Sequence, residues 1–439
     1  MDYGEKYCII GAGSSGIVAG KMMKQAGMPF DIIEREDEVG GNWYYGKPHS
    51  SVYKSTHLIS SKAMTAYLDY PMPDDYPDYP SHVQILAYLR DYARHFGVYD
   101  HIEFNTSVEN CERADSGEWD ITLGNGETRR YKGLVIANGH NWDPKYPNVK
   151  GEFNGTTLHS ADYKTPDVIR DKRVLVVGAG NSGCDIAVES AQNAEQTFHS
   201  TRRGYYYAPK YALGKPSDVV NEASLNLGVP VWLRRIINGL LLKILVGDLR
   251  NYGLRKPDHK FYETHPIVNQ HITYYMGHGK ITPKGDVSEL CGDSVKFVDG
   301  TTEAIDVLIY ATGFNITFPF IDSEKYLNWR DGRPDLYMHA FHREYDNLFV
   351  IGLIQPDSGQ FWIADLQAQV MVGYLKAMAV GSPEAQAFKQ TKATAYPELS
   401  GGVSYVDSTR HLLEIAHHVY KRIMKAHIKQ LGRVVSMVQ

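Results

Sequence analysis

The sequence predicts an α/β fold of two similar units, because one pattern of strand, glycine-rich turn, helix and strand occurs twice. The first copy has these four parts at residues 7–10, 11–16, 17–25 and 29–34. The second copy has them at residues 174–177, 178–183, 184–194 and 196–199. Both turns, GAGSSG and GAGNSG, have G-x-G-x-x-G spacing between a strand and a helix. This context is typical of Rossmann-like dinucleotide-binding domains.

Further helices and strands are expected between and after the two copies. They are a helix over 83–96, two strands over 119–123 and 131–136 around an Asn125-Gly126 turn, two strands that end in small residues over 307–313 and 348–352, and a helical C-terminal part over 411–431.

The composition excludes several classes of protein. The 439 residues carry a net charge of −5 and 43% are hydrophobic, which rules out a disordered chain and makes nucleic acid an improbable partner. The four cysteines form no C-x-x-C pair, so a zinc ribbon and a disulfide reductase are excluded. Sparse cysteine, no secretory signal and no apolar run long enough to span a membrane together predict a cytoplasmic protein.

A segment at 230–247 carries apolar pairs every four residues, which predicts a helix with one apolar stripe. We interpret this helix as packed on the core of its own chain. The alternatives are association with a membrane surface and contact with another subunit, and the net negative charge argues against the membrane.

The first glycine-rich turn has the residues that a dinucleotide site needs. Gly11 allows the tight turn, Gly13 lets the backbone approach a pyrophosphate, and Gly16 lets the helix pack on the strand. Glu34 ends the second strand, where a carboxylate accepts hydrogen bonds from ribose hydroxyls. This site fits FAD or NAD.

The second turn differs where the second strand ends. No carboxylate is present there; instead the chain has two hydroxyl and two guanidinium side chains, Ser200, Thr201, Arg202 and Arg203. These groups bind the 2′-phosphate of NADPH and favour it over NADH. Two dinucleotide sites in one chain imply two cofactors, a flavin and a pyridine nucleotide.

With these sites, the sequence resembles the flavin-containing monooxygenases, within the class B flavoprotein monooxygenases. The run from Phe153 through Gly155 and His159 to Tyr163-Lys164 matches the linker fingerprint of that family, and 311–314 resembles its small-residue segment. The Baeyer–Villiger branch usually has Trp where Tyr163 stands, so the match favours oxygenation of nitrogen and sulfur. The resemblance implies that His159 belongs to the linker and is not a proton-transfer residue.

The resemblance implies contacts for both cofactors. For FAD these are Gly11, Gly13, Ser14, Ser15, Gly16, Glu34, Asn42, Trp43, Ser60, Val108, Asn138, Gly139 and Gln355. For NADPH they are Gly178, Asn181, Ser182, Gly183, Ser200, Thr201, Arg202, Arg203, Ala311, Thr312 and Gly313. The domains are then residues 1–164 and 299–439, which together form a discontinuous FAD domain, and residues 165–298, an inserted NADPH domain.

Two residues are expected at the reacting centre. Ile59 stands where the family usually has an active-site Asn, and an Ile side chain can neither donate nor accept a hydrogen bond. Tyr207, in the cluster 205–207, is expected to wall the nicotinamide or substrate side, with core packing as the alternative.

The resemblance implies an FAD- and NADPH-dependent monooxygenase that uses molecular oxygen. Its C4a-(hydro)peroxyflavin transfers one oxygen atom to a sulfide or amine of a small molecule. The alternatives are Baeyer–Villiger oxidation of ketones, an uncoupled NADPH oxidase that releases hydrogen peroxide, and a non-enzymatic flavoprotein. The sequence leaves open whether the protein is a homodimer.

Overall fold

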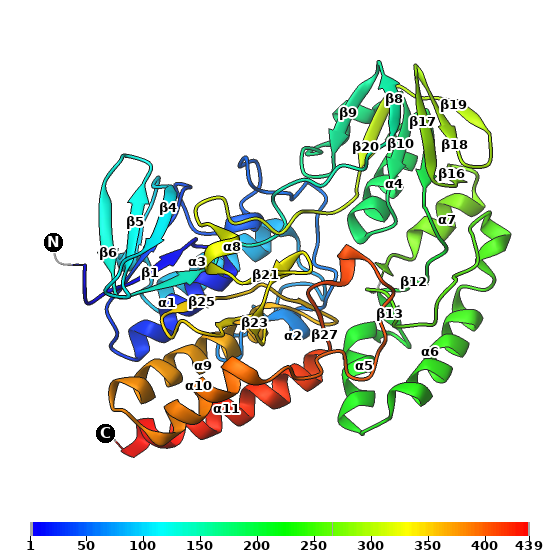
Figure 1. Cartoon of the computed structure of the whole chain (residues 1–439). Coiled ribbons are helices and arrows are strands. Elements are labelled where there is room, and N and C mark those ends of the chain that lie inside the picture. Colours follow the sequence, from blue (N-terminus) through cyan, green and yellow to red (C-terminus); the bar gives the residue numbers. More distant parts are fainter. Residues whose placement is uncertain (1–2, 266, 438–439) are drawn as a thin grey trace.

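The computed structural model describes residues 3–265 and 267–437, with side chains through residue 432, and shows two α/β units side by side (Figure 1). The first unit contains both ends of the chain and a seven-stranded sheet in the order β23-β24-β25-β7-β1-β2-β3. The second unit contains a five-stranded sheet in the order β16-β11-β10-β20-β9.

The strands of the first sheet are β1 (Tyr7–Ile10), β2 (Phe30–Ile33), β3 (Ile102–Glu103), β7 (Gly133–Ile136), β23 (Leu336–Tyr337), β24 (Phe341–His342) and β25 (Leu348–Val350). The strands of the second sheet are β9 (Thr156–His159), β10 (Arg173–Val177), β11 (Gln196–Ser200), β16 (Ile281–Lys284) and β20 (Val307–Tyr310).

The two predicted copies have the same strand pairing, which confirms the Rossmann-like fold. In the first, β1 lies parallel between β2 and β7 and leads into α1 (Ser14–Gln25). In the second, β10 lies parallel between β11 and β20 and leads into α4 (Asn181–Asn193). Parallel strands of this kind have buried faces on both sides and are joined by helices. Both glycine-rich turns therefore lie at the carboxyl ends of central strands, where such sheets bind ligands.

Helices cover one face of the first sheet and a small antiparallel sheet covers the other. The helices are α1, α3 (His82–His95), α9 (Phe361–Ala379) and α11 (His417–Met437), with α10 (Pro383–Thr394) outside them. The small sheet is β4 (Val108–Arg113), β5 (Trp119–Leu123) and β6 (Thr128–Tyr131). Successive side chains of β1 point to opposite faces, so Ile9 joins the helical core and Cys8 the core under the small sheet.

The sheets divide the chain at other positions than the expected 164 and 299. Two strands before residue 164 pair with the second unit: β8 (Lys150–Phe153) with β17 (Val287–Gly292), and β9 with β20. After residue 299, β20 pairs with β10. The expected boundaries therefore cut through the sheets of the inserted unit, because the pairing joins strands that are more than 100 residues apart.

Three other elements differ from the sequence prediction. The hairpin partner of β5 is β6, whereas 133–136 is the separate strand β7 beside β1. The C-terminal helix begins at His417, after a 3-10 turn (Thr409–His411) and the short strand β27 (Glu414–Ile415). The remaining expected strands and the helix over 83–96 are confirmed within one or two residues.

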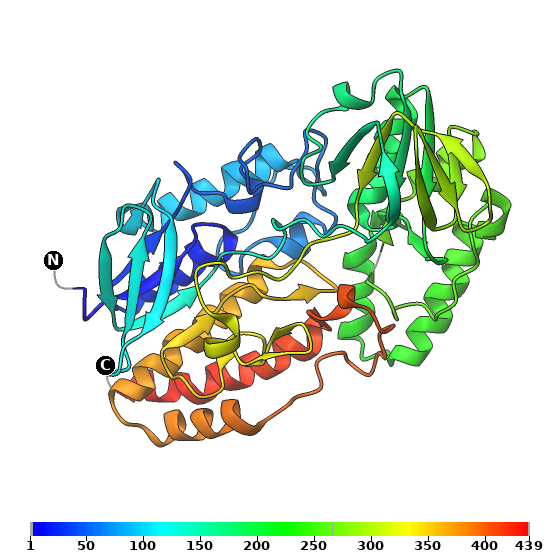
Figure 2. The same ribbon diagram turned by 45° about the horizontal axis from the view of Figure 1, so that its top comes forward.

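The expectation that the 230–247 helix packs on the core is wrong. The helix α6 (Val231–Leu245) lies at the outer side of the inserted unit (Figures 1 and 2). Most of its large apolar side chains are exposed. Trp232 and Ile236 are each 61% exposed and Ile244 is 71% exposed, whereas the buried side chain of this helix is Arg234. The four-residue spacing of apolar pairs correctly predicted a helix. The side of the helix that contacts the rest of the protein, however, is the polar one, with Arg234, Arg235 and Asn238. Within residues 3–265 and 267–437, no helix combines the length and apolar character that crossing a bilayer requires.

Candidate functional site

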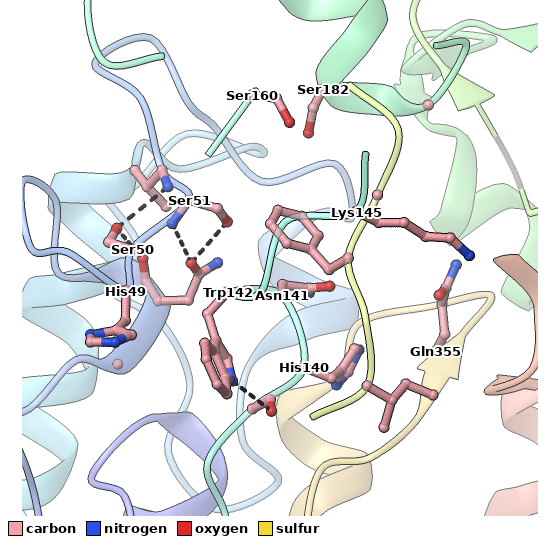
Figure 3. Close-up of a pocket in the computed structure, with 18 of the residues that line it drawn as sticks. His49, Ser50, Ser51, His140, Asn141, Trp142, Lys145, Ser160, Ser182 and Gln355 are labelled. Carbon is pink, nitrogen blue, oxygen red and sulfur yellow. Dashed lines mark hydrogen bonds between the residues drawn. The ribbon is translucent and has the colours of Figure 1, made fainter. Parts of the chain in front are cut away.

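One cavity of about 1040 Å³ lies between the two units, and both glycine-rich turns open into it. Figure 3 shows part of its wall. The sequence-predicted residues that line it are Gly11, Gly13, Ser14, Ser15, Glu34, Asn42, Trp43, Ile59, Ser60, Val108, Asn138, Gly139, Gly178, Asn181, Ser182, Ser200, Arg202, Ala311, Thr312, Gly313 and Gln355. The predicted residues outside its lining are Gly16, Gly183, Thr201, Arg203 and Tyr207.

The two turns share their local geometry. Gly11 has φ of +102° and Gly178 has φ of +125°, a region that side chains other than glycine rarely enter. A Cβ atom on Gly11 would lie 2.8 Å from the carbonyl oxygen of Ala137, and one on Gly178 would overlap the carbonyl oxygen of Ala311. Each turn thus passes directly over the end of a neighbouring strand, which explains the small residues expected there.

The helices after the turns present uncapped N-termini to the cavity. The N-cap residues are Gly13 in α1 and Gly180 in α4, so neither cap has a side chain to accept hydrogen bonds from the first-turn N–H groups. Neither first turn contains an acidic residue. Free N–H groups and the positive end of the helix dipole together bind phosphate. Gly16 and Gly183 lie in the first turns of these helices, where a Cβ atom would overlap the carbonyl of Gly11 or Gly178.

Glu34 connects the end of β2 to the first turn. Its buried carboxylate accepts hydrogen bonds from Ala12 N–H at 2.6 Å and Glu36 N–H at 2.9 Å. Burial raises the pKa of Glu34, and the two N–H donors oppose that shift. Through Ala12 the carboxylate fixes the glycine-rich turn, and it also lines the cavity. Its remaining lone pairs can accept hydrogen bonds from ribose hydroxyls.

A second glycine pair brings another loop against the first turn. Gly41 has φ of +53°, and a Cβ atom on it would lie 2.8 Å from the Cα atom of Gly13. The next residue, Asn42, accepts hydrogen bonds through its Oδ1 from the N–H and hydroxyl of Ser51, at 2.8 and 2.9 Å (Figure 3). The loop 40–51 is therefore a fixed wall of the cavity.

The wall opposite this loop comes from the C-terminal part of the first unit. Gly352 N–H donates to Gln367 Oε1 at 2.8 Å, and Gln355 Nε2 donates to Glu414 Oε1 at 2.8 Å. His140, which the sequence does not single out, lines the same region, and burial lowers its pKa to about 4. A neutral imidazole therefore faces this part of the cavity at neutral pH.

The four residues expected to bind a 2′-phosphate separate in the structure. Ser200 donates its hydroxyl to Gly285 O at 2.7 Å and lines the cavity, as does Arg202. Arg203 instead pairs with Asp258 at 2.9 Å and is outside the lining, and Thr201 is buried. The sequence cannot distinguish the two arginines, because the partner of Arg203 is 55 residues away.

Tyr207 does not wall the cavity. It belongs to β12 (Tyr207–Ala208), is 2% exposed and packs in the core of the inserted unit. Tyr205 is the member of this cluster that lines the cavity. Side chains two residues apart on an extended segment point to the same side, as those of Tyr205 and Tyr207 do. Only Tyr205 reaches the cavity.

The side chain of Ile59 lies on the cavity wall and is 37% exposed. Two neighbouring polar groups have partners: Ser60 Oγ lies 2.8 Å from Thr65 Oγ1, and His57 Nδ1 lies 2.9 Å from Ser55 O. The Ile59 side chain itself adds an apolar surface to the wall.

The linker fingerprint joins the units. Lys164 donates through its Nζ to the carbonyls of Ser50, Val52 and Ala161, and Tyr163 donates its hydroxyl to Glu189 at 2.6 Å. His159 is fully buried and accepts from Ala161 N–H at 3.1 Å.

Several cavity residues were missed by sequence reasoning. They are Gly180, Asp185, Lys145, Ser408, Thr409 and Arg410. Gly180 carried a signal, because it is the second glycine of the second motif. Asp185 lies two residues after the same motif. The sequence gives no indication of the other four, since only long-range packing brings them to the cavity.

The sequence model of the flavin-binding monooxygenase-like family matches residues 4–414. The chain belongs to this family. It is 33% identical to flavin-containing monooxygenase 5 of Rattus norvegicus over 93% of this chain and 80% of that protein. It is also 33% identical to flavin-containing monooxygenase 2 of Homo sapiens over 85% of this chain and 74% of that protein.

Solved structures of flavin monooxygenases share the fold. An S-allyl-L-cysteine S-oxygenase from Allium sativum has a TM-score of 0.67 at 21% identity, covering 97% of this chain and 88% of that one. The OTEMO complex with FAD and NADP has a TM-score of 0.72 at 18% identity, covering 97% and 98%.

Family membership gives the enzyme class. The chain is an NADPH-dependent flavin monooxygenase, and its cofactors are FAD and NADPH. The resemblance seen in the sequence is thereby confirmed.

Proposed function

We propose that this enzyme transfers one oxygen atom from molecular oxygen to a soft nucleophile, a sulfide or an amine, on a small molecule. The observation that carries the proposal is the single cavity into which both glycine-rich turns open. In a shared cavity the flavin and the nicotinamide can lie next to each other, so that a hydride passes directly from one to the other. Two separate clefts would keep the two cofactors apart.

The first crevice fits FAD. Its pyrophosphate would lie at the uncapped N-terminus of α1, where Gly13 and Gly41 leave room for backbone to approach. Glu34 would hold a ribose. Asn42, Trp43, Val108, Asn138 and Gln355 line the space beside these groups.

The second crevice fits NADPH. Its pyrophosphate would lie at the uncapped N-terminus of α4, and Arg202 offers a guanidinium with no carboxylate within salt-bridge distance in the described part of the chain. No acidic residue ends β11, so a 2′-phosphate meets no carboxylate at that position.

When bound, FAD accepts a hydride from NADPH and then activates oxygen for transfer. The residues of the chain position the two cofactors, and the walls of the cavity limit the access of water to the reacting centre. The fixed loop 40–51 and the linker residue Lys164 keep the two crevices facing each other.

Ile59 favours a second candidate, an uncoupled NADPH oxidase that releases hydrogen peroxide. An aliphatic wall gives no hydrogen bond to a polar group beside it. Baeyer–Villiger oxidation is the third candidate; a cyclohexanone monooxygenase shares the fold, whereas Tyr163 in the linker argues against that branch.

The experiment is a product balance on the FAD-loaded enzyme with NADPH, oxygen and methyl phenyl sulfide. We expect sulfoxide in nearly equal amount to the NADPH consumed. Peroxide equal to NADPH with no sulfoxide would select the oxidase, and lactone from cyclohexanone without sulfoxide would select ketone oxidation.

A further inference from the structure

A three-residue turn from the first unit reaches the nucleotide crevice of the inserted unit. This turn, residues 408–410, precedes β27 by only a few residues and yet lines the cavity beside Arg202 and Tyr205. It lies more than 200 residues along the chain from both of them. Figure 1 shows its segment, in orange to red, entering the space between the units.

Hydrogen bonds connect the turn to both sides of the junction. Arg202 donates through Nη2 to Ser408 Oγ at 3.2 Å, and Lys145 donates through Nζ to Thr409 Oγ1 at 2.8 Å. The guanidinium of Arg410 lies 6.0 Å from the centre of the Tyr205 ring. Three cations from three distant segments therefore meet at one turn.

These three cations are not neutralised by the described residues. Lys145, Arg202 and Arg410 have no carboxylate within 4.0 Å among side chains 3–265 and 267–432, whereas the neighbouring Arg203 is paired with Asp258. The acidic residue that lines the cavity beside the end of β11 is Asp286, and it makes no ion pair with them. Uncompensated positive charge on a concave wall attracts an anion.

We propose that the 408–410 turn is a clamp for the 2′-phosphate of NADPH, with Arg202, Arg410 and Lys145 as its charged contacts. This proposal rests on the proposed function of the second crevice. The hydroxyls of Ser408 and Thr409 hold two of the cations in the ligand-free protein and become donors to the phosphate when it arrives. The nucleotide then bridges the two units, and Arg203 takes no part in its selection.

The clamp gives a reason for selectivity between the two nicotinamide nucleotides. NADH lacks the phosphate that the three cations contact, so it leaves them unpaired. Each charge-assisted hydrogen bond to the phosphate that is lost should weaken binding at least about tenfold.

The test measures equilibrium binding of NADP⁺ and NAD⁺ to the FAD-loaded protein by calorimetry, independently of turnover. Arg410→Gln and Lys145→Gln should each raise the dissociation constant for NADP⁺ about tenfold and leave that for NAD⁺ within about twofold. Arg203→Gln is the matched control and should change neither. Thermal melting of each variant checks that it is folded.

Hydrogen exchange supplies a second measurement. NADP⁺ should slow exchange of the amides at 405–411, and NAD⁺ should slow it much less. Wild-type affinity for NADP⁺ in both Arg410→Gln and Lys145→Gln would overturn the clamp while leaving the second crevice as the nucleotide site. Absence of any nucleotide binding to the wild-type protein would overturn the proposed function as well.

Discussion

His417 Nε2 lies 2.6 Å from Glu222 Oε2, and this contact joins the C-terminal helix α11 to α5 (Ser217–Asn226) of the inserted unit. The other ring nitrogen lies 2.6 Å from Asp357 Oδ1, two residues after the cavity residue Gln355. One buried imidazole thus links both units next to the candidate site.

This link predicts a stability that falls with rising pH. Burial lowers the pKa of His417, but the hydrogen bonds and charges of Asp357 and Glu222 outweigh burial and raise it above its usual 6.5. The imidazolium therefore stabilises the fold fully below the unfolded pKa, and this contribution is lost as pH rises through the higher folded pKa. His417→Gln should cost about 2 kcal/mol of unfolding free energy at pH 6 and much less at pH 9.

The measurement is the melting temperature of both proteins at each pH. Glu222→Gln is the companion variant, because it removes the negative charge that faces His417 from α5 and leaves Asp357 in place. An equal loss at pH 6 and pH 9 would show that His417 acts through packing and not through charge.

Gly180→Ala should separate nucleotide binding from folding. Gly180 has φ of −67° and no atom lies within 4 Å of the position that a Cβ atom would take, so the apoprotein accepts alanine there. The methyl group would occupy the space in which a pyrophosphate approaches α4. We expect affinity for NADP⁺ to fall about tenfold or more, with the melting temperature changed by less than about 2 °C.

The control for this variant is Gly183→Ala in the same helix. A Cβ atom at Gly183 would overlap the carbonyl of Gly178, so this substitution should lower the melting temperature itself. If Gly180→Ala bound NADP⁺ as tightly as the wild type, the nucleotide would not lie at the N-terminus of α4.

Ile59→Asn should improve coupling between NADPH oxidation and oxygen transfer. The side chain lies on the cavity wall and is 37% exposed, so an amide of similar size fits without burial of an unpaired polar group. The amide adds a donor and an acceptor to an apolar wall. We expect the share of NADPH electrons recovered as hydrogen peroxide to fall, measured by peroxidase-coupled absorbance.

The matched control is Ile59→Leu, which keeps the wall apolar and should leave the peroxide share unchanged. If both variants changed the peroxide share equally, the effect would come from the shape of the side chain and not from the hydrogen bonds of the amide.

The outward apolar face of α6 predicts an unusual pattern of mutational effects. Replacing Trp232, Ile236 and Ile244 together by serine should change the melting temperature by less than about 2 °C, because these side chains are mostly exposed. Arg234→Ala should lower it more, since this side chain is 4% exposed and its guanidinium lies 5.1 Å from the centre of the Tyr262 ring. Calorimetry of both variants tests this order, and a large loss in the triple variant would contradict it.

The sequence by itself determined the two Rossmann-like units and the residues of their turns. Glycines 11, 13, 178 and 183 and the carboxylate of Glu34 could be predicted, because a tight turn between strand and helix is a local requirement on backbone conformation. The apolar period of residues 230–247 likewise predicted the helix observed over 231–245, but it could not show which face of this helix contacts the rest of the protein.

Only the tertiary structure decided which side chains meet at the cavity. Arg203 pairs with Asp258 outside the cavity, Tyr207 packs in the core whereas Tyr205 lines the cavity, and the 408–410 turn brings Ser408 to Arg202 from more than 200 residues along the chain. The physical reason is that a charged or aromatic side chain interacts with the groups that lie near it in space, and these are often far from it in the sequence. Pairing between segments that are distant in the sequence sets that proximity: a bridge joins Gly204 to Pro257, next to Arg203 and Asp258. Strand pairing over more than 100 residues likewise sets the edges of the inserted unit.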